Sequence, residues 1–114
     1  MAIDYPRTMA AFKIGAEAGY AACQHHVGFG YYKGRGVAVD YTVARAWLEK
    51  AAAQVIPESF VQLGVMALDG TGMAPSFRRG REYYGRALEL GYKEAVSRME
   101  NLTEGIELVT SSTK

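Results

Sequence analysis

The sequence has 114 residues, of which 49% are hydrophobic and 22% are charged. This length suits one domain, and the apolar share is too high for a disordered chain. The 13 basic and 12 acidic residues give a formal net charge of +1. Such a balance provides no electrostatic basis for binding nucleic acid or a membrane surface.

Cysteine content and the N-terminal residues bear on the compartment. Cys23 is the one cysteine, so no intrachain disulfide can form, and a single thiol is typical of a reducing compartment. The first residues, MAIDYPRTMA, lack the apolar stretch of a secretory signal. No run approaches the roughly 18 apolar residues of a membrane span. We therefore expect a soluble, cytoplasmic protein, unless the sequence is a segment of a longer one.

The chain matches itself when it is shifted by 36 residues, and no gap is needed. The segment GRGV at 34–37 aligns with GTGM at 70–73, and Trp47 aligns with Tyr83. Small residues share one column of this alignment: Cys23, Ser59 and Ala95. A repeat of this length predicts pairs of helices that stack on one another.

We expect helices, in chain order, at about 4–18, 21–33, 40–54, 57–69, 76–90 and 93–108. Asp4, Asp40 and Ser76 stand where a side-chain oxygen caps the free N–H groups of a helix start. Gly19 and Gly91 suit the left-handed conformation that ends a helix. The predicted fold is an all-α solenoid of antiparallel helix pairs, about six helices in all.

Each pair is joined internally by a Gly-x-Gly segment, at 34–36 and at 70–72. Glycine permits the positive φ that a tight reversal requires. The alternative is a phosphate-binding loop, which is poorly supported. No strand precedes these glycines, and Lys33-Gly34 has the reverse order of the Gly-Lys-Ser/Thr motif.

The later helix of the first full pair carries an apolar stripe at three- and four-residue steps, typical of a packed helix. Its members are Ala44, Trp47, Leu48, Ala51 and Ala52. We expect the small residues to let helices approach closely, and Trp47 or Tyr83 to fill the space between repeats.

These columns resemble the Sel-like repeat (SLR), a relative of the tetratricopeptide repeat. The first full repeat supplies Cys23, Val27, Gly28, Tyr31, Gly34, Gly36, Val37, Asp40, Ala44, Trp47, Lys50, Ala51 and Ala52. The second keeps Leu63, Gly64, Gly70 and Gly72, but has Ala67, Ser76 and Gly80 in place of Tyr, Asp and Ala. The similarity covers about residues 3–104. It implies an α/α superhelix whose first helices line a concave face, and an adaptor or scaffold that gathers other proteins.

We expect one domain over 1–114. It divides into a half-repeat at 3–19, repeats at 20–55 and 56–91, a C-terminal half-repeat or cap at 92–109, and a polar tail at 110–114. Glu100 replaces the close-packing glycine of the earlier repeats, and a charged outer face is what a terminal cap needs. The array is therefore expected to end here. We expect Ala10, Ala11 and Ile14 of the N-terminal half-repeat to be less well covered by neighbouring residues.

Three departures from the repeat pattern predict local weaknesses. Val55 replaces the glycine that ends a helix, and a β-branched residue adopts positive φ with difficulty. We therefore expect the turn at 54–57 to differ from the turn at Gly91. Gly80 and Gly85 lie inside a predicted helix, where each costs roughly 1 kcal/mol relative to alanine. That helix is expected to fray most easily.

Removing the core columns from the first helices leaves the candidates for partner binding. They are His25, His26, Phe29, Tyr32 and Lys33, then Val61, Gln62, Val65, Leu68 and Asp69, and finally Ser97, Arg98 and Asn101. Their aromatic, aliphatic and hydrogen-bonding groups predict a partly apolar groove for a peptide or helix. The alternative is that these side chains pack between adjacent first helices. Lys33, Arg98 and Asn101 could hold an acidic group, or be ordinary surface residues.

Metal binding and catalysis are poorly supported, so we expect no cofactor and no enzyme. His25 and His26 are adjacent on a helix and point about 100° apart. Cys23 and His26 could face one ion, but zinc sites usually have four ligands. Cys23 shares its column with small, packed residues and has no evident base.

The main hypothesis is accordingly a protein-interaction module that binds a partner peptide or helix on the concave face. The alternative is a structural repeat protein that works as a homo-oligomer. An enzyme or a small-molecule sensor is a third and weaker alternative.

Overall fold

The computed structural model describes residues 3–93 and residue 95. Over these residues it contains five α-helices and no strand. The helices are α1 (Tyr5–Glu17), α2 (Ala21–Lys33), α3 (Tyr41–Ala53), α4 (Pro57–Asp69) and α5 (Phe77–Glu89). Of the helix predicted at 93–108, only residues 93 and 95 are described. The predicted tail at 110–114 lies outside the described residues.

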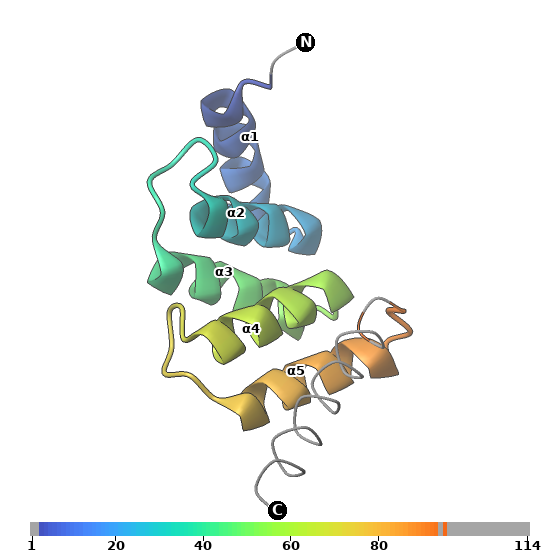
Figure 1. Ribbon diagram of the computed structural model, residues 1–114. Coiled ribbons are helices and arrows are strands. Elements are labelled where there is room, and N and C mark those ends of the chain that lie inside the picture. Colours follow the sequence, from blue (N-terminus) through green and yellow to red (C-terminus); the bar gives the residue numbers. More distant parts are fainter. Residues whose placement is uncertain (1–2, 94, 96–114) are drawn as a thin grey trace, which may run out of the picture.

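The structure has the same period as the sequence. Helices α1, α3 and α5 begin 36 residues apart, as do α2 and α4, and each of the five has 13 residues. Figure 1 shows them stacked in chain order. The most extensive contacts join α2 to α3 and α4 to α5, and α2 also contacts α4. The predicted all-α solenoid of helix pairs is therefore confirmed.

The predicted caps begin α1, α3 and α5. The N–H groups of Arg7, Val43 and Arg79 donate to the side chains of Asp4, Asp40 and Ser76 respectively, each over 3.1 Å. Each bond satisfies one backbone donor that has no partner within the helix. The starts of these helices are thus determined locally, before any packing.

Close approach within each pair depends on one glycine. A Cβ placed on Gly28 would lie 2.7 Å from Cγ of Leu48, and one on Gly64 would lie 2.5 Å from Cε1 of Tyr84. Any larger residue would push α2 away from α3, or α4 away from α5. Leu48 is fully buried and Tyr84 is 2% exposed.

The predicted aromatic residues lie where successive repeats meet. Trp47 of α3 is partly buried and packs against the cluster formed by Met9, Ala16 and Val27 of α1 and α2. Tyr83 of α5 is also partly buried, and packs against the larger cluster of α3 and α4. Complete burial of such a ring contributes roughly 2–3 kcal/mol, so these partly buried rings contribute less.

The Gly-x-Gly segments form tight turns, as predicted. All four of these glycines have φ between 74° and 79°. The second glycine of each turn also meets the start of an earlier helix. A Cβ on Gly72 would lie 2.6 Å from the carbonyl oxygen of Tyr41. The turn therefore connects two helices of one repeat and also contacts the preceding repeat.

The expectation for the turn at 54–57 is wrong. Val55 adopts φ 68°, close to the 83° of Gly91, and is the only non-glycine residue with positive φ in the described chain. The same hydrogen bond occurs in both turns. The N–H of Val55 donates to the carbonyl oxygen of Ala52, and the N–H of Gly91 donates to that of Leu88, each over 2.9 Å. Packing of the flanking helices imposes one turn geometry, and valine adopts it at a cost of about 1–2 kcal/mol.

The structure adds a packing role for Gly80 that the sequence did not indicate. Gly80 is buried, and a Cβ there would lie 2.6 Å from Cδ2 of Leu68. This glycine makes room for a neighbour, so its absent side chain is compensated by packing. Around Gly85, in contrast, no atom of another described element lies within 4 Å of the corresponding position.

Val55→Gly should raise the free energy of unfolding by about 0.5–1 kcal/mol. Relief of the left-handed strain exceeds the entropy that an added glycine costs, about 0.4–1 kcal/mol. Val55 is 54% exposed, so little burial is lost. Urea unfolding followed by circular dichroism measures the change. Val55→Ala retains the positive φ without this relief and serves as the control; a less stable glycine variant would contradict the strained turn.

Gly85→Ala and Gly80→Ala form a matched pair within α5. Alanine at 85 should stabilise the protein by roughly 1 kcal/mol, since helix propensity improves and space is free. Alanine at 80 should not give this gain, because its methyl group would displace Leu68. Thermal unfolding of the two variants compares them directly. An equal gain at both positions would show that Leu68 does not need Gly80.

Candidate interaction surface

The predicted binding residues of the first and second repeats come together on two neighbouring helices. We call this the α2–α4 surface, and its members are His25, His26, Phe29, Tyr32, Lys33, Gln62, Val65, Leu68 and Asp69. All are partly or fully exposed. The third-repeat candidates, Ser97, Arg98 and Asn101, lie outside the described residues.

Aromatic rings form a row along α2. The rings of His25 and Phe29 stack with centroids 6.3 Å apart, as expected for residues one helical turn apart. The ring of His26 stacks on Phe12 of α1 at 4.6 Å and meets His25 at 5.7 Å. The row therefore extends from α1 along the exposed side of α2.

A hydrogen bond joins the two helices of this surface. His25 Nδ1 and Ser59 Oγ are 2.8 Å apart, and Ser59 is fully buried. Burial lowers the pKa of His25, nearby His26 lowers it further, and Glu58 opposes the shift. At neutral pH, His25 is therefore an uncharged group that connects consecutive repeats.

Tyr32 and Gln62 face each other across the α2–α4 contact. Burial, reinforced by nearby Asp69, raises the pKa of Tyr32 above its ordinary value, so its hydroxyl stays protonated at neutral pH. A hydrogen-bonding interaction with the Gln62 side chain opposes this shift. The Gln62 Nε2 atom is buried, and its approach to the Tyr32 hydroxyl falls short of ideal hydrogen-bond geometry.

The aliphatic members of the surface are also used in packing. Val65 and Leu68 are partly buried and pack against the larger core cluster, with Leu68 lying on Gly80. The interpretation of Val61 as a surface residue is wrong. It is only 8% exposed and belongs to that cluster, because its side chain points toward the core. The α4 part of the surface is thus less exposed than the sequence suggested.

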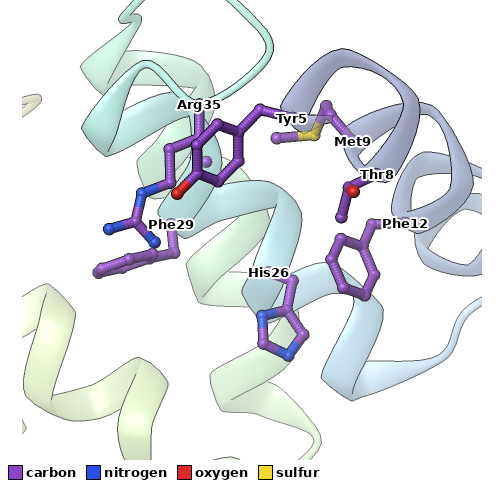
Figure 2. Close-up of a pocket in the computed structure, with 8 residues that line it drawn as sticks. Tyr5, Thr8, Met9, Phe12, His26, Phe29 and Arg35 are labelled. Atoms are coloured by element: carbon purple, nitrogen blue, oxygen red, sulfur yellow. The ribbon is translucent and has the colours of Figure 1, made fainter. Parts of the chain in front are cut away.

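A pocket that the sequence analysis missed adjoins this surface between α1 and α2. Its volume is about 90 Å³, and its lining residues are Tyr5, Thr8, Met9, Phe12, His26, Phe29, Gly30 and Arg35. Figure 2 shows Arg35, Tyr5 and Phe29 gathered on one side and His26 with Phe12 on the other. The 36-residue register was the available signal, since it places Thr8 and Phe12 at the positions of buried Ala44 and Leu48.

Two cations flank the aromatic part of the pocket. The Arg35 guanidinium lies 5.2 Å from the centroid of Phe29 and 5.6 Å from that of Tyr5. Lys33 Nζ lies 5.9 Å from the centroid of Phe29 and 5.7 Å from that of Tyr32. Neither cation forms an ion pair with a described residue. Cation–π contacts hold them in place and leave their charges uncompensated.

Metal sites and membrane spans have no structural support in the described part of the chain. Between residues 3 and 93, and at 95, no three His, Cys, Asp or Glu side chains lie where they could hold a metal ion. None of the five helices is long and apolar enough to cross a membrane.

Stacked helix pairs with a 36-residue period define an α/α repeat protein. The family model of the Sel1 repeat matches residues 21–55 and 61–92, so the chain belongs to the Sel1 repeat family. Sel1 repeats commonly mediate protein–protein interactions and are in general non-catalytic scaffolds.

Solved structures show the same fold. A Sel1 repeat protein from Oxalobacter formigenes is 31% identical with a TM-score of 0.75, over 79% of this chain and 68% of that one. A protective antigen of uropathogenic Escherichia coli that displays an SLR fold is 29% identical with a TM-score of 0.82. That similarity covers 87% of this chain but only 21% of the antigen. A search of curated proteins found no match.

Acidification should destabilise the protein through His25. Between its lowered pKa in the folded state and the ordinary 6.5, the unfolded chain binds more protons, so stability falls as pH drops through this window. The decrease in unfolding free energy from pH 7.5 to 5.5, measured in urea, should be smaller for His25→Gln. Glutamine stays neutral and can still bond Ser59. Equal decreases in both proteins would contradict this role of His25.

Proposed function

We propose that this protein is an adaptor module that binds a segment of a partner protein along the α2–α4 surface. The observation that carries the proposal is the continuity of this surface across two repeats. Exposed aromatic groups of α2 adjoin polar groups of α4, and the His25–Ser59 bond connects the two helices. A surface that spans two helices suits an extended peptide or a helix better than a small molecule.

The chemistry of the surface supports a protein ligand. Phe29 and Tyr32 offer rings that are large and lose little entropy when they are covered, which is typical of interface anchors. A single free cysteine favours action in a reducing compartment.

Self-association is the second candidate function. Large apolar side chains are well exposed near α1, with Ile14 at 73%, Tyr20 at 68% and Ile3 at 63%. None of these residues belongs to the α2–α4 surface, and they could meet a second copy. Sedimentation velocity over a wide concentration range separates the two functions, since a strict monomer removes this alternative.

Tyr32→Ala combined with Gln62→Ala should weaken partner binding at least tenfold, which corresponds to about 1.4 kcal/mol. Partner peptides first identified by affinity capture would be titrated against the purified variants by isothermal calorimetry. Tyr20→Ala removes a similar exposed ring elsewhere and should bind normally. Circular dichroism must show the helical signal retained in all variants. Unchanged affinity in the double variant would place the binding site on another surface.

A further inference from the structure

The repeat register identifies one helix face that the described residues leave open. Thr8 and Phe12 of α1 correspond to Ala44 and Leu48 of α3, and to Gly80 and Tyr84 of α5. In α3 both residues are fully buried, and in α5 Gly80 is buried and Tyr84 is 2% exposed. Thr8 and Phe12 are only partly buried. The difference arises because α2 covers α3 and α4 covers α5, whereas no described helix takes this place on α1.

The pocket between α1 and α2 lies on this open face. Tyr5, Thr8 and Phe12 form its α1 wall. The equivalent faces of α3 and α5 are each covered by an antiparallel helix. The molecule therefore contains two examples of the kind of element that packs on such a face. That precedent favours a helix over an extended strand or a small molecule as the occupant of the α1 face.

The precedent also specifies a small residue in the occupant. Gly28 of α2 lies directly against Leu48, and Gly64 of α4 lies against Tyr84. By the same register the occupant would place one residue against Phe12. Phe12 is larger than Leu48, so only glycine would allow comparable approach of the two helices.

Positive charges on this protein specify the residue type at a second position of the occupant, four residues after the one that faces Phe12. In α2 this position is Tyr32, whose ring lies 5.6 Å from that of Tyr41 and whose pKa responds to Asp69. A shift of 36 residues replaces Tyr41 by Tyr5 and Asp69 by Lys33. The fourth residue would accordingly lie near Tyr5 and Lys33. Arg35 lies over the Tyr5 ring, and neither cation is paired with a described acid.

We propose that the open face of α1 binds a helix of a partner protein that carries Gly against Phe12 and Asp or Glu four residues later. The carboxylate lies between Lys33 and Arg35 and compensates both charges. Residues four apart share one face of a helix, so one side of the partner makes both contacts. Tyr5, Phe12 and Arg35 lie outside the α2–α4 surface, whereas Lys33 belongs to both, so the proposal shares this one charged contact with that surface.

The test uses a synthetic peptide with the sequence of residues 56–70, made helical by a hydrocarbon staple. It contains Gly64, and its Leu68→Glu version places a carboxylate four residues later. The matched control peptide carries Leu68→Lys. Fluorescence anisotropy with the intact protein at low ionic strength should show at least tenfold tighter binding of the acidic peptide. Raising the salt concentration should reduce this difference.

Protein variants decide whether the contacts are the proposed ones. Lys33→Glu combined with Arg35→Glu should reverse the preference, so that the lysine peptide binds more tightly. Phe12→Lys should abolish binding of both peptides, while Tyr32→Ala with Gln62→Ala should leave it intact. Failure of the adaptor proposal would therefore not affect this result.

Three outcomes would overturn the proposal. The first is equal affinity for the two peptides, and the second is a preference for the acidic peptide that survives the double charge reversal. The third is self-association of the protein alone that Arg35→Glu abolishes, since a second copy would then be the occupant. Each is read from the same anisotropy and sedimentation measurements.

Discussion

The contact of Gly28 with Leu48, repeated as that of Gly64 with Tyr84, is the constraint on which the rest of the structure depends. A glycine at each crossing lets the two helices of a pair pack with backbone against side chain. This short separation determines where the next pair can stack. It brings α2 close enough to α4 for His25 to reach Ser59 over 2.8 Å. The polar connection between repeats is therefore a consequence of apolar packing within them.

The second repeat satisfies this constraint with different side chains. Tyr31 of α2 is replaced by the fully buried Ala67, while Leu48 is replaced by the larger Tyr84. Ala44 becomes Gly80, and the neighbouring Leu68 fills that space. Where a side chain of one helix becomes smaller, a larger side chain on the facing helix or an adjacent residue fills the space. Cores tolerate such exchanges when total volume is retained, which explains why a repeat that looks degenerate in sequence keeps the helix bounds of its neighbour.

The 36-residue register predicted the helices and their caps because these depend on residues close in sequence. The side chains of Asp40 and Ser76 bond backbone groups three residues away, so local sequence is sufficient. Val55 was mispredicted because its own preference competes with the packing of two helices, and packing is stronger. The packing role of Gly80 was not predicted because its partner Leu68 lies on another helix.

The candidate surface was predictable only in part, for the same physical reason. Subtracting core columns correctly left the exposed groups of α2, since periodicity determines which side of a helix is buried. The same subtraction wrongly left Val61 among the exposed residues. Its burial depends on how much of the α4 surface is covered by neighbouring helices. The pocket of Tyr5, Phe12 and Arg35 joins a helix start, a helix middle and a loop residue. Such a set appears only once the crossing of α1 and α2 is known.

Helix α2 can serve two binding surfaces because its successive side chains diverge by about 100°. His25 turns toward α4 and bonds Ser59, whereas His26 turns toward α1 and stacks on Phe12. Phe29 lies between them, stacked with His25 and lining the pocket as well. The two surfaces therefore meet along α2, where His26 and Phe29 belong to both.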